Sequence, residues 1–209
     1  MFKMINYIYF FRLLNKPVII MDEVDHKIIS QLQRNGRTTF KTLGELTGYT
    51  SMGVKKRVDK LLKEGIINIS AQLNLEKLNL CAAVVLIETD GPEYANKLIK
   101  CFEECPRVVY IFKTIGGYNI IALVVAENQE TLESIAMEKC SLKSKEGIRR
   151  SEFYPIRDIH YSPFMPVRRY LAKKNLPTPP CNVDCETCER YISNECVGCS
   201  AAKYYRGSL

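Results

Sequence analysis

The C-terminal part of the chain carries five cysteines within nineteen residues, at the spacing C-x3-C-x2-C-x7-C-x2-C. Closing such short loops costs little conformational entropy, so the two C-x2-C pairs can bring four thiolates together. Four thiolates form a common tetrahedral site for structural zinc. The segment 181–209 has few apolar side chains, and a module of this size generally needs such a staple to fold. We therefore expect a small metal-binding module in this part of the chain.

Zinc is the expected cofactor, and its expected ligands are Cys185, Cys188, Cys196 and Cys199. Cys181 could replace one of the four or remain free. The alternative is an iron–sulfur cluster with four thiolate ligands, because C-x3-C-x2-C is the spacing of radical-SAM enzymes, although this chain has no room for their barrel. Disulfide pairing ranks third. The remaining cysteines fall in predicted elements of the core and are interpreted as packing residues: Cys81, Cys101, Cys105 and Cys140.

The first twenty residues resemble a secretion signal only superficially. Arg12 and Lys16 interrupt the apolar run, no small-residue cleavage site follows, and the stretch is too short and too charged to span a membrane. We interpret residues 1–20 as an N-terminal extension outside the folded domains, with Met21 as an alternative initiator. The expected location is the cytoplasm, with no membrane partner. Thiols stay reduced there, so the C-x2-C pairs indicate metal rather than disulfide.

Residues 21–71 follow the pattern of three short helices. A capping side chain precedes each helix: Asp22 for the first, Thr38 or Thr39 for the second, and Thr50 for the third. A glycine turn separates the second helix from the third, and the isoleucine-rich stretch 66–69 predicts a short strand afterwards. This arrangement is a winged helix-turn-helix.

The third helix of this region, residues 51–63, is strongly basic. The whole chain has 30 Lys and Arg against 23 Asp and Glu, a net charge of +7 that favours nucleic acid without proving it. Because this helix would enter the major groove, its charges predict contacts to double-stranded DNA. Its lysines and arginine would mainly neutralise phosphates, which gives affinity rather than sequence choice. The predicted DNA-binding residues are Phe40, Thr50, Ser51, Met52, Lys55, Lys56, Arg57 and Lys60.

A linker at residues 72–80 leads to a second pattern at residues 81–159. Its apolar runs and turns predict the order β-α-β-β-α-β, with Gly116 and Gly117 in a hairpin. This order is a ferredoxin-like sandwich, with two helices on one face of the sheet. The other face is bare and predicts association into a homodimer. Residues 160–180 are rich in proline and basic side chains, and we interpret them as a stiff spacer before the module at 181–209.

These features together resemble the Lrp/AsnC family of leucine-responsive, or feast/famine, regulators. The segment MDEVDHKIISQLQRNGRTTFKTLGELTGYTSMGVKKRVDKLLKEGII is similar to the family's helix-turn-helix, AQLNLEKLNLCAAVVLIE to its linker and first sandwich strand, and TIGGYNIIALV to its effector-loop hairpin. The resemblance covers residues 21–158 and implies an α+β fold. It also implies a homodimer that can assemble into tetramers or octamers, pseudo-palindromic promoter DNA, and a small effector, commonly an amino acid. The cysteine tail is an addition to this pattern.

The resemblance implies an effector site in the hairpin. Its residues here are Thr114, Gly116, Gly117, Tyr118 and Asn119. Members that respond to amino acids usually carry an acidic side chain at the position of Asn119. An amide can accept a hydrogen bond from an ammonium group but lacks the charge. The other interpretation is a plain hairpin turn with a core aromatic, because paired glycines mark turns by themselves.

The predicted function is sequence-specific transcriptional regulation rather than catalysis. The sequence has no nucleophilic triad motif, paired-carboxylate site, P-loop or G-x-G-x-x-G. One alternative is an enzyme that decarboxylates sirohaem, because some proteins of this architecture do so with His and Arg residues. This chain has only His26 and His160, and neither lies in a basic cluster. The second alternative is a redox or iron sensor that acts through an iron–sulfur tail. Residues 21–160 alone are expected to dimerise and bind DNA.

Overall fold

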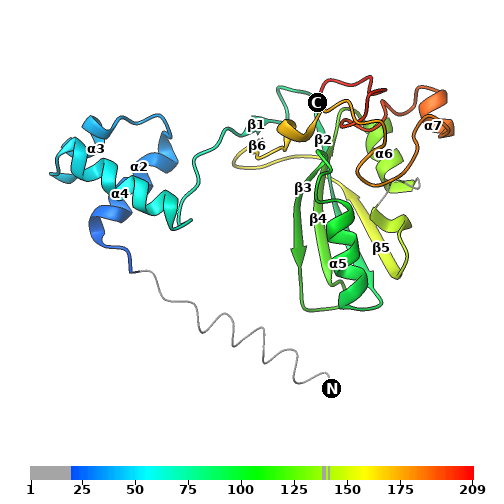
Figure 1. Ribbon diagram of the computed structural model, residues 1–209, viewed down its shortest axis with the longest axis horizontal. Helices are drawn as coiled ribbons and strands as arrows, with labels where there is room; N and C mark the ends of the chain where they lie inside the picture. Colours follow the sequence, from blue (N-terminus) through cyan, green and yellow to red (C-terminus); the bar gives the residue numbers. More distant parts are fainter. Residues whose placement is uncertain (1–19, 138–139, 141) are drawn as a thin grey trace, which may run out of the picture. The chain divides into compact units, whose positions relative to one another are not determined.

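The structure is a computed structural model that describes residues 20–137, 140 and 142–209 (Figure 1). Nearly all of the N-terminal extension expected at residues 1–20 therefore lies outside the described residues. The chain divides into two compact units, and the boundary falls between Ser70 and Ala71.

The first unit contains three helices, α2 (Glu23–Arg34), α3 (Phe40–Thr47) and α4 (Ser51–Lys63). Asp22 caps α2 in a capping box with Asp25, and the hydroxyl groups of Thr39 and Thr50 accept hydrogen bonds from the first turns of α3 and α4. Such caps satisfy N–H groups that have no partner inside the helix. The buried core of the unit consists of Ile28, Leu43, Val54 and Val58. The predicted helices and the Asp22 and Thr50 caps are confirmed.

The turn between α3 and α4 depends on two glycines. Gly48 has a φ of 77°, a left-handed conformation that other residues adopt at a cost. A Cβ atom on Gly44 would lie 2.6 Å from the carbonyl oxygen of Tyr49, so only glycine permits this close approach. The strand predicted at residues 66–69 is wrong. Within the described residues, the next strand after α4 is β1 (Leu73–Asn74), because this isoleucine-rich stretch has no strand to pair with.

The second unit is built on a four-stranded antiparallel sheet. In chain order its elements are β2 (Cys81–Thr89), α5 (Pro92–Cys101), β3 (Val108–Lys113), β4 (Ile120–Ala126), α6 (Gln129–Met137), the 3-10 turn η1 (Leu142–Ser144) and β5 (Ile148–Pro155). The strands lie in the order β3-β4-β2-β5. This order and the β-α-β-β-α-β sequence confirm the predicted ferredoxin-like sandwich. Figure 1 shows α5 and α6 against the sheet.

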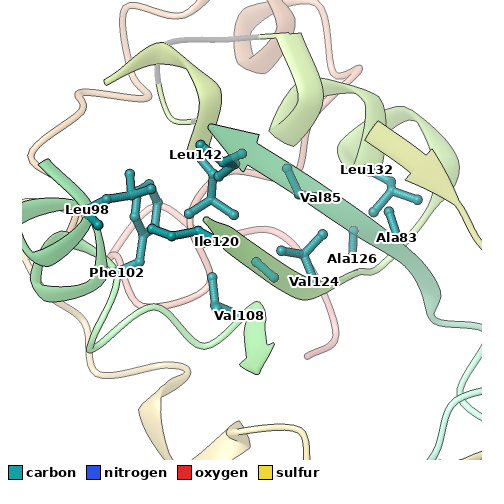
Figure 2. Packing of buried hydrophobic residues seen from close by; sticks show 13 residues of the cluster. Ala83, Val85, Leu98, Phe102, Val108, Ile120, Val124, Ala126, Leu132 and Leu142 are labelled. Carbon is teal, nitrogen blue, oxygen red and sulfur yellow. The ribbon is translucent and has the colours of Figure 1, made fainter. Parts of the chain in front are cut away.

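Alternate residues of the strands form the main core beneath the two helices. Ala83, Val85 and Ile87 from β2 meet Ile120, Ala122 and Val124 from β4, as expected from the two-residue period of a strand. Leu98 and Phe102 cover them from α5 and its C-terminal cap, and Leu132 from α6 (Figure 2).

The segment that we predicted as a linker contributes to the second unit. β1 pairs with β6 (Phe164–Met165), and Leu75 is fully buried. Leu75 packs with Val125, Val167 and Leu209 in a second core cluster, on the opposite face of the sheet from the helices. The prediction that this face is bare is therefore wrong for one end of the sheet, because residues distant in sequence cover it.

The predicted stiff spacer at 160–180 is also part of the packed structure. It contains β6 and the 3-10 turn η2 (Arg169–Leu171). The Arg168 guanidinium donates hydrogen bonds to four backbone carbonyls in and beside the α5–β3 loop, those of Phe102, Glu103, Cys105 and Val108, at 2.6–3.3 Å. This arginine ties the segment to the sandwich, so the proline-rich composition does not mark a free linker here.

The cysteine-rich residues 181–209 pack on the same unit and include α7 (Glu189–Ile192). Arg190 Nε donates to Ser134 Oγ on α6 at 2.7 Å, and the Val197 N–H donates to Thr131 Oγ1 at 3.3 Å. Ala201, Ala202 and Leu209 are at most 1% exposed. The expected independent module is therefore docked on the sandwich, which supplies the core that the tail cannot build alone.

Candidate functional site

Helix α4 presents most of the residues predicted to bind DNA. Thr50, Ser51, Met52, Lys55, Lys56 and Lys60 are all exposed. Phe40 opens α3 and is 37% exposed. Val54, Val58 and Leu61 hold the opposite side of α4 against the core. The apolar period of the helix thus directs its lysines to solvent on one side.

Arg57 occupies a different position from the lysines. Its Nη1 lies 2.7 Å from Asp22 Oδ2 and 2.9 Å from Asp25 Oδ1, and its guanidinium lies over the Tyr49 ring at 5.2 Å. The backbone N–H of Asp25 and then Arg57 hold the pKa of Asp22 below its ordinary value. Arg57 therefore fastens α4 to the first turn of α2, which the charge pattern alone did not indicate.

The predicted effector residues all lie in the loop between β3 and β4. Gly116 has a φ of 157°, and Gly117 is exposed. Thr114 donates from its hydroxyl to the Tyr118 carbonyl at 2.5 Å, which closes the loop. The Asn119 side chain points back to the end of β2, where its Oδ1 accepts from the Thr89 N–H at 3.0 Å. Asn119 thus extends the contacts between β2 and β4.

A carboxylate lies beside this hairpin on the adjoining strand. Glu152 on β5 accepts short hydrogen bonds from the hydroxyl groups of Tyr118 and Tyr154. These bonds hold the pKa of Glu152 below its ordinary value. The Arg150 guanidinium lies over the Tyr118 ring at 4.4 Å. An acidic group therefore stands near the hairpin even though Asn119 is neutral.

Each of the two units matches a known family of protein domains. Residues 21–68 match the winged helix-turn-helix DNA-binding domain, and residues 82–156 match the Lrp/AsnC ligand binding domain. An uncharacterized HTH-type transcriptional regulator of Pyrococcus furiosus is 39% identical over 106 residues, which cover 50% of this chain and 72% of the relative. The chain belongs to the Lrp/AsnC family. It is a DNA-binding transcriptional regulator with a ligand-binding domain, and its relatives are regulators rather than enzymes.

Two further proteins are similar to this chain over a larger share of their own length. The uncharacterized HTH-type transcriptional regulator YezC of Bacillus subtilis is 37% identical over 115 residues, 54% of this chain and 81% of the relative. The crystal structure of PH0061, from Pyrococcus horikoshii, superposes with a TM-score of 0.63 at 26% identity and covers 69% of this chain and 97% of that chain. No helix among the described residues is both long and apolar enough to cross a membrane.

The Lrp/AsnC ligand-binding match ends at residue 156, before the cysteine tail. Four of the five tail cysteines line one cavity of about 50 Å³: Cys181, Cys185, Cys196 and Cys199. Cys188, a predicted zinc ligand, does not line this cavity and instead precedes the first turn of α7. Among the described residues, no three His, Cys, Asp or Glu side chains converge closely enough to hold one metal ion as they stand.

Two cysteines of the sandwich reach the same cavity. Cys105, in the loop after α5, and Cys140, after α6, line it together with the tail cysteines. Burial first, and then Cys199, raise the pKa of Cys105 to about 11, against the opposing effect of the Arg107 N–H. Burial and Cys199 likewise raise the pKa of Cys185 to about 12. Our interpretation of Cys105 and Cys140 as simple packing residues missed this arrangement, because nothing in their sequence spacing links them to the tail.

A buried ion pair joins the sandwich to the tail beside the cavity. Arg107 Nη2 lies 2.8 Å from Glu127 Oε2, and these side chains are 10% and 5% exposed. The same nitrogen donates to the Gly198 carbonyl in the tail at 2.6 Å, and the Tyr205 hydroxyl donates a short hydrogen bond to Glu127. Sequence reasoning did not find this pair. The only signal in the sequence was that Arg107 directly precedes the apolar strand β3 and Glu127 directly follows the apolar strand β4.

Proposed function

We propose that this Lrp/AsnC regulator binds promoter DNA as a homodimer and that α4 enters the major groove. The observation that carries this proposal is the row of exposed lysines on α4, Lys55, Lys56 and Lys60, on the side opposite the buried core. These lysines would neutralise phosphates. Two copies of α4 in a dimer would meet two half-sites about one helical turn, or a multiple of it, apart.

The N-terminal end of α4 is the part that would approach the bases. Ser51 and Met52 are exposed there, and Met52 is 62% exposed. Phe40 at the start of α3 and Thr50 complete the proposed contact set. Arg57 is left out of the phosphate contacts, because its guanidinium already pairs with two carboxylates of α2.

The uncovered end of the sheet supports self-association. Tyr110 and Phe112 on β3 stack with ring centroids 5.6 Å apart, and they are 43% and 51% exposed. Tyr154 on β5 is 50% exposed. It lies on the same face of the sheet as Tyr110, because Tyr110 pairs with Leu123, Leu123 pairs with Val84, and Val84 pairs with Tyr154. An exposed aromatic patch of this kind is a typical protein interface. We propose the homodimer through this face, with tetramers or octamers as higher assemblies.

The proposed effector is a small molecule bound at the hairpin, with an amino acid as the expected class. Thr114, Gly116, Gly117 and Tyr118 would form the binding loop. The ammonium group of an amino acid would pair with Glu152, which carries the negative charge that Asn119 lacks, and would compete there with the hydroxyl groups of Tyr118 and Tyr154. Ligand-induced changes in melting temperature should therefore be lost in Glu152→Gln and retained in an Asn119→Ser variant.

We also propose that the cysteine-rich tail binds a metal. Zinc is the expected ion and an iron–sulfur cluster the alternative, since closely spaced cysteine thiolates suit both. The metal would fix the tail on the sandwich rather than fold a separate module, because residues 181–209 already pack on α6.

Titration of DNA by matched charge variants tests the DNA-binding proposal. The double variant Lys55→Gln/Lys56→Gln should bind promoter DNA more weakly, and the slope of log K against log salt should fall by about 0.9 for each lost phosphate contact. Lys97→Gln/Lys100→Gln on α5 removes the same charge from the other unit and should leave the slope unchanged. Equal slopes in both double variants would contradict the assignment of α4.

A further inference from the structure

The cavity beneath the tail brings together six cysteines from two parts of the chain that are far apart in sequence. The sandwich contributes Cys105 and Cys140, and the tail contributes Cys181, Cys185, Cys196 and Cys199. All nine cysteines of the chain are free thiols rather than disulfide partners in this structure. Cys81, Cys101 and Cys188 do not line the cavity, so the gathering is selective even among the cysteines.

The rest of the cavity wall is mainly apolar. Phe102, Val108, Val124 and Leu142 belong to the main core shown in Figure 2 and also line the cavity, so the sulfurs face a site with little access to water. Arg107 is the charged residue of the lining. Its charge is already paired with Glu127, and burial disfavours free thiolates, so thiolates in this cavity would require a bound metal cation.

The thiols of the two parts face the same cavity. Cys105 and Cys140 of the sandwich line it together with Cys181, Cys185 and Cys199 of the tail. Simple packing does not require six sulfurs around one small cavity, since any apolar side chain of similar volume would serve. A metal bound by several of these thiols explains why cysteine occurs at six positions around the cavity.

Two buried hydroxyl groups next to these cysteines give a second, independent observation. Ser200 Oγ and Tyr204 OH are buried, and no hydrogen bond of ordinary geometry within the described residues satisfies them. Such groups are costly to leave unsatisfied. Ser200 follows Cys199 directly, and the Tyr204 hydroxyl faces Cys185. A metal-bound thiolate is a stronger hydrogen-bond acceptor than a thiol, so it would supply the missing partner.

We propose that this cavity is a single thiolate metal centre whose ligands come from both the sandwich and the tail, with Cys105 and Cys140 as ligands and Cys188 outside the set. The inference rests on the proposal that the tail binds metal, and it changes the ligand set predicted from spacing. The centre is zinc or an iron–sulfur cluster. Coordination requires rotamer changes that bring the sulfurs together, or a cluster that spans them, because no three of them converge on one point as they stand.

Metal analysis of the full chain purified without oxygen tests this proposal. Cys105→Ser and Cys140→Ser should each reduce the metal content per chain by more than half. Cys188→Ser in the tail and Cys81→Ser in the sandwich are matched controls and should retain the wild-type content. Zinc alone identifies a zinc centre, whereas iron with an equal amount of inorganic sulfide identifies an iron–sulfur cluster. Either metal, lost in the two cavity variants, supports the shared centre.

Alkylation of the wild-type protein provides a second readout that does not depend on variants that fold. Iodoacetamide should modify Cys105, Cys140 and the four tail cysteines of the cavity only after a chelator has removed the metal. Cys188 should react at the same rate with and without the chelator. Unprotected Cys105 and Cys140, with protected tail cysteines, would overturn the shared centre and leave a tail that binds metal alone. A wild-type protein that binds neither zinc nor iron with sulfide, even after reconstitution, would overturn both proposals.

Discussion

Asn119 and Thr89 form a closed pair of hydrogen bonds between two neighbouring strands. Asn119 Oδ1 accepts from the Thr89 N–H at 3.0 Å, and Asn119 Nδ2 donates to the Thr89 carbonyl at 3.2 Å. The side chain therefore imitates the backbone of one more residue in the ladder between β4 and β2. Both the donor and the acceptor of the amide are used, which explains why an amide and not a carboxylate occupies this position.

Asn119→Asp should destabilise the protein. A carboxylate would keep the bond from the Thr89 N–H, but its second oxygen would face the Thr89 carbonyl, and two acceptors would then oppose each other in a half-buried site. We expect a loss of about 1–2 kcal/mol in the free energy of unfolding, measured by urea denaturation. Asn128→Asp is the matched control, because Asn128 Oδ1 only accepts the Thr131 N–H at the start of α6 and an acid is favoured there. Equal stability of the two variants would contradict this account.

Arg57 should contribute to stability and not to the salt dependence of DNA binding. Its contacts to Asp22 and Asp25 hold α4 on the first turn of α2. Arg57→Ala should lower the melting temperature while the slope of log K against log salt stays within about half a unit of wild type. Lys55→Ala is the control and should show the reverse pattern. A reduced slope with an unchanged melting temperature in Arg57→Ala would return this residue to the DNA contacts.

The buried pair of Arg107 and Glu127 should be strongly coupled. Arg107→Ala leaves Glu127 buried without its partner, which typically costs about 3–5 kcal/mol in the free energy of unfolding. The double variant Arg107→Met/Glu127→Leu removes both charges and should recover a large part of this loss. Lys174→Ala breaks a more exposed pair with Glu104 and should cost at most about 1 kcal/mol. A double variant as unstable as Arg107→Ala would show that the charge pairing is not the cause.

The sequence was sufficient to predict the elements whose signals are local. The Asp22 and Thr50 caps, the periodic apolar residues of α4 and the β-α-β-β-α-β order all depend on short windows, and the structure confirms them. The register of β2 against β4 follows from the same alternation of buried residues. The family resemblance rested on these local patterns and is confirmed as well.

Long-range packing could not be predicted in this way. The pairing of β1 with β6 joins two-residue strands about 90 residues apart, and no local period marks segments this short. Arg168 falls in the segment predicted as a stiff spacer, yet it donates to four carbonyls in and beside the α5–β3 loop. The cavity shared by Cys105, Cys140 and the tail cysteines could not be predicted either, because only the fold brings these residues together.

The second core cluster predicts that the tail is needed for the stability of the sandwich. Leu209 is 1% exposed and packs in the cluster that contains Leu75, Ala82 and Val125, and its N–H donates to the Tyr205 hydroxyl at 2.7 Å. Leu209→Ala should cost about 2–3 kcal/mol in the free energy of unfolding, as expected for a buried leucine. Ile192→Ala in α7, 64% exposed, should change it by less than about 0.5 kcal/mol.

Truncation to residues 21–160 extends this prediction and opposes the expectation from sequence that these residues suffice. Removing residues 161–209 would uncover Leu75 and Val125 and would leave Arg107 and Glu127 without their contacts to Gly198 and Tyr205. Newly exposed apolar surface of this kind promotes aggregation. We therefore expect the truncated protein to precipitate or to elute as large aggregates in size-exclusion chromatography, whereas full-length protein with Cys188→Ser elutes as wild type. A truncated protein that is soluble and unfolds cooperatively would contradict this prediction. It would show that the sandwich is stable without the tail and that Leu209 is not essential to its core.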